Sequence, residues 1–216
     1  MNGSMKKKWL VAEFVLLYVG IPLFIYLDYN FTHPTMVIVP LVLIMLLILK
    51  RYHFFQLKDL VQLNLKRVKP WSHFITVVIN ACILVLSVYL FDHENLFNLM
   101  RSNPQMLVLL CILYPIYSAF GQEIIYRLFL FQRYRTIFKS KVLLVLVSSL
   151  SFSYMHIIYY SHVSVILTFI LGVYLSITYL KTRSVLFVSI LHGIYGNLIF
   201  IVGLGNYFWL DMHKFM

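Results

Sequence analysis

Five ionisable side chains lie inside stretches of sequence that are otherwise apolar: Glu13, Glu123, Arg127, His156 and His192. Charge is costly in hydrocarbon, so ionisable groups in such stretches are paired, face a cavity or carry function. A carboxylate beside histidines can hold a water molecule and take its proton, and histidine or arginine can stabilise an anion. The set can therefore supply a general base, electrophilic donors and groups able to bind a metal within an apolar body. Glu13 follows the lysines at 6–8 closely, so we expect it at an interface in a structural role.

Glu123 and Arg127 are four residues apart, which places them on one face of a helix. Gln122 adds a third polar group beside them. An internal ion pair that neutralises both charges explains the spacing, and a pair that faces a polar cavity explains it equally well.

His156 ends a serine-rich stretch in which Ser149, Phe152 and Ser153 share its helical face. A stripe of this kind suits a wet cavity, although a histidine in a membrane helix is often only a hydrogen-bonding partner for another helix.

His192 is followed by Gly193, Gly196 and Asn197. Asn197 lies about 140° around a regular helix from His192, so the two converge only if a glycine allows a bulge or a break. Counted at about 1.5 Å per residue from the nearest basic loops, Glu123, His156 and His192 all lie near the middle of a bilayer of about 30 Å. Their shared depth favours one common site.

Composition identifies the apolar body as a membrane protein. Of the 216 residues, 62% are hydrophobic and only 12% are charged, which excludes an ordinary soluble domain and a disordered chain. The 18 Lys and Arg against 7 Asp and Glu give a net charge of +11. These basic residues form short clusters between long apolar runs, as in polytopic membrane proteins, so we expect no nucleic-acid partner.

The chain is predicted to be an all-α polytopic transmembrane bundle of seven or eight spans. The fourth apolar stretch is too long for one simple span, and Pro115 or Gly121 either kinks it or divides it. The stretches are 9–27, 35–49, 73–91, 106–138, 142–160, 163–180 and 184–204.

The basic loops alternate along the chain with loops that have few or no basic residues, which places the N-terminus and every strongly basic loop in the cytoplasm. We expect residues 1–105 to form a three-span region with a basic loop at 50–72, residues 106–205 to form the catalytic core, and residues 206–216 to form a short tail. The protein is predicted to be integral to a membrane, the inner one if its source is bacterial.

Three short motifs resemble those of the CPBP intramembrane proteases, which include the type II CAAX prenyl proteases and relatives linked to bacteriocin processing and immunity. The first family motif, Glu-Glu-x-x-x-Arg, is similar to residues 122–127, with Gln122 in place of the first Glu. The second, Phe-x-x-x-His, is matched by Phe152 to His156. The third, His-x-x-x-Asn, is approached by residues 192–197, where Gly196 stands at the Asn position and Asn197 follows one residue late.

The resemblance implies hydrolysis of a peptide bond inside the membrane, with a peptide or membrane protein as substrate and the lipid bilayer as surroundings. Glu123 and His156 would hold the attacking water, His192 with Asn197 would stabilise the oxyanion, and Arg127 would keep Glu123 ionised. Since Gln cannot act as a base at neutral pH, the role of the first Glu would pass from Gln122 to Glu123 or to His156.

Three alternatives stay open at this point. By ligand type, Glu123, His156 and His192 also suit zinc, although the Glu/His scheme needs no metal. Gln122 favours an inactive scaffold that acts in bacteriocin immunity or partner binding. Haem ligation by the two histidines would leave Glu123 and Arg127 unexplained, and a transporter would be expected to show a sequence repeat.

Overall fold

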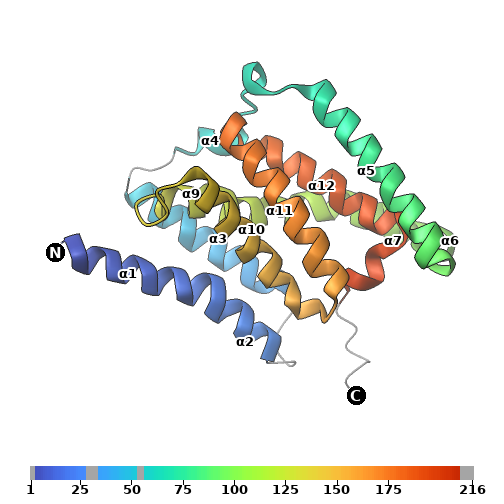
Figure 1. The fold of residues 1–216 in the computed structure, drawn as a ribbon, viewed down its shortest axis with the longest axis horizontal. Coiled ribbons are helices and arrows are strands. Elements are labelled where there is room, and N and C mark those ends of the chain that lie inside the picture. Colours follow the sequence, from blue (N-terminus) through green and yellow to red (C-terminus); the bar gives the residue numbers. More distant parts are fainter. Residues whose placement is uncertain (1–2, 28–33, 53–55, 210–216) are drawn as a thin grey trace.

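The computed structural model describes residues 3–27, 34–52 and 56–209, and every regular element within these ranges is helical. The connection between the first two predicted spans, residues 28–34, and the predicted tail at 206–216 therefore lie largely outside the described residues. Two helices, α1 and α2, form one N-terminal rod, and α10, α11 and α12 lie side by side in the centre (Figure 1). The α-helices are α1 (Gly3–Val15), α2 (Ile21–Leu27), α3 (Pro34–Arg51), α4 (Lys58–Val61), α5 (Pro70–Phe91), α6 (Asn98–Ser102), α7 (Pro104–Tyr114), α8 (Phe120–Glu123), α9 (Leu130–Arg133), α10 (Lys141–Met155), α11 (His162–Thr182) and α12 (Val185–Val202).

Six helical stretches are long and apolar enough to cross a membrane. The prediction of an all-helical membrane bundle is confirmed, whereas the count of seven or eight spans is not. The predicted span at 35–49 falls within α3, which is not one of the six. The six are Lys7–Leu27, Pro70–Phe91, Pro104–Arg133, Lys141–Tyr159, His162–Thr182 and Val185–Val202.

The long fourth stretch is one continuous helix, so Pro115 and Gly121 do not divide it. Proline lacks the N–H that would continue the α-helical ladder, and a π-helical turn, Pro115–Ala119, begins at this point. A second π-helical turn, Ile124–Phe129, follows α8. A π-helical turn rotates the side chains that follow it about the helix axis. In this helix one such turn precedes Glu123 and the other follows it.

The hydrophobic core is packed around this continuous helix, whose side-chain faces are shifted by its two π-helical turns. Phe129, Phe152, Leu175 and Val188, from four different helical stretches, are fully buried in one hydrophobic cluster. The same cluster includes residues of α1 and α3, so both N-terminal helices pack on the predicted catalytic region. Large apolar side chains on α5 stay exposed, among them Phe91 at 88% and Trp71 at 76%. Apolar surface of this extent suits contact with lipid.

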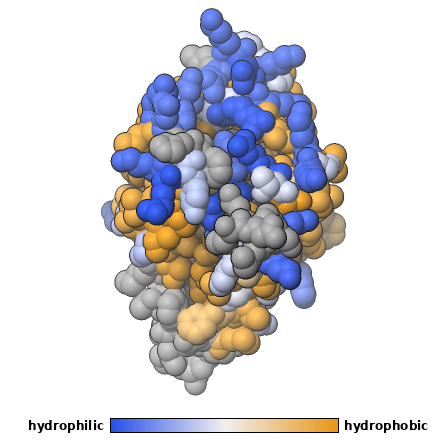
Figure 2. Space-filling view, turned by 90° about the vertical axis from the view of Figure 1, so that its left-hand side faces the viewer, coloured by the Kyte–Doolittle hydropathy of each residue, from blue (hydrophilic) through white to orange (hydrophobic). Residues whose placement is uncertain are grey.

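Hydrophilic side chains gather on the face that carries the N-terminus, α4 and the turn after α9 (Figure 2). Exposed basic residues from all the predicted basic loops contribute to this end of the molecule. They are Lys7, Lys8, Lys50, Arg51, Lys58, Lys66, Arg67, Lys69, Arg135, Lys139, Lys141, Lys181 and Arg183.

At the opposite end, the loop after α5 is docked on the end of α12. The backbone N–H of Phe97 donates to the carbonyl of Val202 at 3.2 Å. Gly203, which ends α12, has a φ of +105°, and a Cβ there would lie 1.8 Å from the carbonyl oxygen of Asn95. Only glycine allows both that backbone conformation and this close approach.

Glu13 ties the N-terminal rod to the end of α9. Its two carboxylate oxygens accept hydrogen bonds from Arg133 at 2.9 and 2.7 Å, and Tyr134 donates a third at 2.9 Å. Partial burial and Glu13 raise the pKa of the Tyr134 hydroxyl, which stays protonated and can donate this bond. Glu13 is therefore structurally engaged.

Replacement of Glu13 by Ala should lower the free energy of unfolding by about 1–3 kcal/mol, because hydrogen bonds to a charged group are lost at a partly buried position. Denaturant titration in detergent micelles measures the change. Glu94→Ala, which removes an exposed loop carboxylate, is the control and should have less than about 0.5 kcal/mol of effect. Equal losses for both variants would contradict this assignment.

Candidate active site

Glu123 and Arg127 form an ion pair with no solvent exposure in the middle of the bundle. Arg127 Nη1 lies 3.1 Å from Glu123 Oε1, and both side chains are 0% exposed. The pair faces α12, where His192 Nδ1 lies 2.7 Å from the same oxygen. A buried charge is tolerated only when it is paired in this way. The structure thus brings together three of the residues that the sequence predicts for one site.

The protonation of His192 follows from its partners. An ionised carboxylate can only accept hydrogen bonds, so Nδ1 carries a proton and donates it to Glu123. Arg127 already balances the charge of Glu123, and a second buried cation would be uncompensated. His192 is therefore neutral, and its Nε2 is an acceptor. The hydroxyl of Tyr114, on α7, lies 3.0 Å from Nε2 and donates to it.

Phe152 lies at the centre of the site. The guanidinium of Arg127 lies over its ring, 4.6 Å from the centroid. The rings of His156 and His192 contact it at centroid distances of 4.8 and 5.3 Å. The first and last residues of the second sequence motif thus line one apolar wall of the site.

His156 is the residue at which α10 tightens into a 3₁₀ turn, His156–Tyr159. Its Nδ1–H donates to the carbonyl oxygen of Phe152 at 2.7 Å. This bond leaves Nε2 as an acceptor with a free lone pair. His156 is 8% exposed, so it lies inside the protein but close to its surface.

Polar atoms of the ion pair remain available to a bound molecule. Within the described residues, Glu123 Oε2 and Arg127 Nε are buried and have no hydrogen-bond partner, whereas Arg127 Nη2 donates to the Gly172 carbonyl at 3.2 Å. Buried polar atoms are nearly always satisfied in proteins. An unpartnered oxygen on a carboxylate whose other oxygen is bound by Arg127 and His192 is a place for water or substrate.

Two of the predicted site residues, Gln122 and Asn197, donate their amide N–H groups to partners other than Glu123 and His192, while their amide oxygens are buried without a partner among the described residues. The Gln122 amide donates to Ser118 Oγ on its own helix at 2.8 Å. The Asn197 amide donates to the carbonyl oxygen of Cys111 at 3.0 Å. Because α12 is regular and has no bulge at either glycine, the convergence of Asn197 with His192 that a bulge would have allowed does not occur. Tyr114, instead, is the polar neighbour of His192 Nε2.

The site does not fit a three-ligand zinc ion as it stands. Among the residues that the structure describes, no three His, Cys, Asp or Glu side chains are arranged to hold a metal. Both ring nitrogens of His192 are engaged, by Glu123 and by Tyr114.

Comparison with known proteins agrees with the motifs. Residues 104–198 match the family model described as type II CAAX prenyl endopeptidase Rce1-like. Over these residues the chain is similar to that family. The match covers Tyr114, Glu123, His156 and His192, and it confirms the resemblance inferred from the three motifs. No curated protein matches the chain, and neither does any solved structure.

The sequence did not predict Tyr114 as a neighbour of His192, and the π-helical turn explains why. Nine residues separate Tyr114 from Glu123, which in a regular α-helix places them on opposite faces, about 180° apart. The turn Pro115–Ala119 adds roughly one residue and shifts the later faces by about 100°. Both side chains then face α12, where Glu123 contacts Nδ1 of His192 and Tyr114 contacts Nε2.

Arg127→Ala should lower the free energy of unfolding by about 3–5 kcal/mol, since it leaves the Glu123 carboxylate buried without its counter-ion. Arg101→Ala is the matched control, because Arg101 is exposed and donates only to a loop carbonyl at 2.9 Å. Its loss should stay below about 1 kcal/mol. If unfolding in micelles shows no difference between the two variants, the ion pair does not carry the stability assigned to it.

Proposed function

We propose that the protein is an intramembrane endopeptidase that hydrolyses a peptide bond with a water molecule activated by Glu123 and His156. One observation carries the proposal: Glu123 Oε2 is buried without a partner while Oε1 is fixed by Arg127 and His192. The carboxylate is thus held in place by one oxygen and open at the other. The match of residues 104–198 to a membrane endopeptidase family supports this chemistry.

The water is held by two acceptors. Glu123 Oε2 and His156 Nε2 each have a free lone pair, and the His156 ring contacts the same Phe152 ring as His192, the partner of Glu123. In the proposed scheme one proton of the water is directed to each of these two acceptors. Its oxygen lone pair then points at the substrate carbonyl. Holding the nucleophile in place removes most of the entropic cost of a bimolecular attack.

The bonds and protons balance without any further reactant. The water oxygen bonds to the carbonyl carbon, and Glu123 takes the released proton as general base. The carbon–nitrogen bond then breaks, and the same proton passes to the leaving amine. Arg127 keeps Glu123 ionised between turnovers, because its guanidinium favours the carboxylate form.

The substrate we propose is a peptide or protein segment that reaches the site from the bilayer. The exposed apolar side chains of the helices leave lipid as the surroundings of the site. The basic face would lie in the cytoplasm with the N-terminus, since basic loops are retained there. In a bacterial cell this is the inner membrane.

Glu123→Gln and His156→Gln should each lower kcat by about 10²-fold or more, as expected when a general base or a water-holding group is removed. The full chain is reconstituted in liposomes with quenched-fluorescent membrane peptides, prenylated CAAX peptides included. Cleavage is followed by fluorescence and the products by mass spectrometry.

The control variants carry the same types of substitution at residues outside the site. Glu94→Gln and His162→Gln alter an exposed carboxylate and an exposed imidazole, and both should retain wild-type rates. Absence of cleavage by the wild type, or undiminished cleavage by Glu123→Gln, would refute the proposed function.

A further inference from the structure

We propose that Tyr114 is a catalytic residue of this site, whose phenol donates a hydrogen bond to the carbonyl oxygen of the scissile bond as negative charge develops there. The inference rests on the proposed function and adds a residue to it. The preceding scheme supplies a base and a nucleophile but needs a donor for the oxyanion.

Proton counting excludes neutral His192 as that donor. Its one proton is on Nδ1 and is committed to Glu123 at 2.7 Å. Nε2, the nitrogen that faces away from Glu123, therefore has a lone pair and nothing to donate. The proton at this position belongs to the Tyr114 hydroxyl, 3.0 Å from Nε2.

The phenol can change its acceptor without moving its ring. A hydroxyl proton rotates about the C–O bond, so it can leave Nε2 for a substrate oxygen that comes within reach. The lone pair of Nε2 is then free to accept a hydrogen bond from another donor. Since no side chain has to rearrange, the donor is in position before the charge develops, which is what makes such donors effective.

The ring of Tyr114 is held in the space on α12 that is left by the absence of a side chain at Gly196. A Cβ at Gly196 would lie 2.0 Å from the ring, so the tyrosine occupies the space that a side chain at this position would fill. Phe200, one turn further along α12, contacts the ring edge-on at 5.7 Å. A side chain at 196 and the Tyr114 ring are therefore mutually exclusive.

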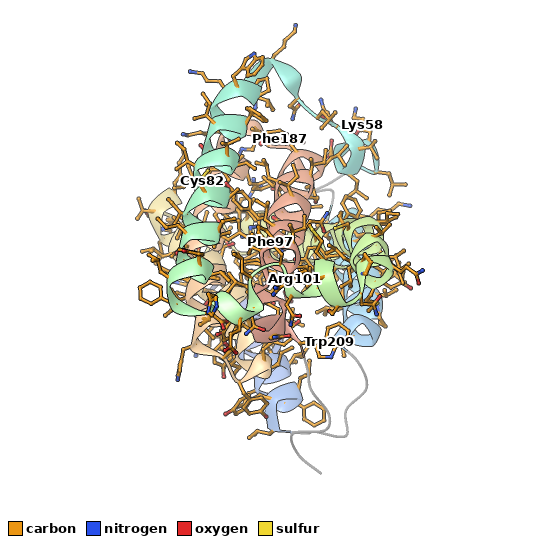
Figure 3. All side chains as sticks on the ribbon, turned by 90° about the vertical axis from the view of Figure 1, so that its right-hand side faces the viewer. Lys58, Cys82, Phe97, Arg101, Phe187 and Trp209 are labelled. Carbon is orange, nitrogen blue, oxygen red and sulfur yellow. The ribbon has the colours of Figure 1, made fainter. Side chains whose placement is uncertain are left out.

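A cavity reaches the neighbourhood of this ring from the end of the bundle opposite the basic face. It has a volume of about 280 Å³ and is lined by Leu110, Met106, Phe200 and Trp209, with Asn98 and Asn206 among its polar residues. Trp209 lies at this end of the molecule with Arg101, far from Lys58 (Figure 3). Phe200 lines the cavity and packs on the Tyr114 ring. Leu110, which also lines the cavity, lies one turn before Tyr114 on α7. An apolar segment in the cavity would thus lie against Phe200, which itself packs on the Tyr114 ring.

Tyr114→Phe tests the inference because it removes the hydroxyl and keeps the ring packed against Gly196 and Phe200. We expect kcat to fall by about 10²–10³-fold, the usual effect of losing one oxyanion donor. KM and the melting temperature should stay close to those of the wild type. A tyrosine with a purely structural role would change the melting temperature and leave kcat unchanged.

Tyr117→Phe is the matched control. Tyr117 lies in the adjacent π-helical turn and is 60% exposed, so its hydroxyl is outside the site. Full-length variants are compared in liposomes with a peptide that the wild type cleaves. Tyr117→Phe should retain the wild-type kcat.

The outcomes separate this inference from the proposed function. If Glu123→Gln is inactive and Tyr114→Phe stays within about threefold of the wild type, the inference is wrong and the proposed function stands. If the wild type cleaves nothing, or Glu123→Gln cleaves as well as the wild type, both are overturned.

Discussion

The carboxylate of Glu123 is a charge buried in the apolar interior of a membrane protein, and the arrangement of the central helices satisfies it. Arg127 supplies the counter-charge from the same helix, and His192 supplies a proton from α12. Arg127 is itself held by the Gly172 carbonyl of α11 and by the ring of Phe152 from α10. One anion thus links the four helical stretches that form the core. The same anion is the base of the proposed chemistry, so stability and function depend on one group.

The close approach of the fourth stretch to α12 is what brings these groups together. Gly193 lies against Pro115, and Gly196 lies against Tyr114, with no room for a Cβ at either position. The proline that faces Gly193 also starts the π-helical turn that rotates Glu123 into the site. The two glycines after His192 therefore allow close packing of two helices, while α12 itself remains regular.

Much of this arrangement could be predicted from the sequence. The apolar runs and the basic loops predicted a helical membrane bundle, and the spacing of Glu123 and Arg127 predicted their ion pair. The three motifs placed Glu123, His156 and His192 at one site. The sequence could not predict the π-helical turns, because their effect on helix faces depends on tertiary packing. It therefore suggested Asn197 as the partner of His192, whereas the amide of Asn197 donates to the Cys111 carbonyl and Tyr114 occupies that position. The span count also went beyond the six long apolar helices.

We infer that Glu123 is ionised inside the bundle and that it holds His192 as a neutral imidazole with its proton on Nδ1. Nitrogen-15 NMR of the histidine-labelled protein in lipid, with the His192 signals assigned by a His192→Gln variant, measures this tautomer directly. The structure predicts a protonated Nδ1 and an unprotonated Nε2 at neutral pH. A protonated Nε2 with a bare Nδ1 would mean that Glu123 is neutral and donates the hydrogen bond itself, and it would contradict both the proposed base and the role assigned to Tyr114.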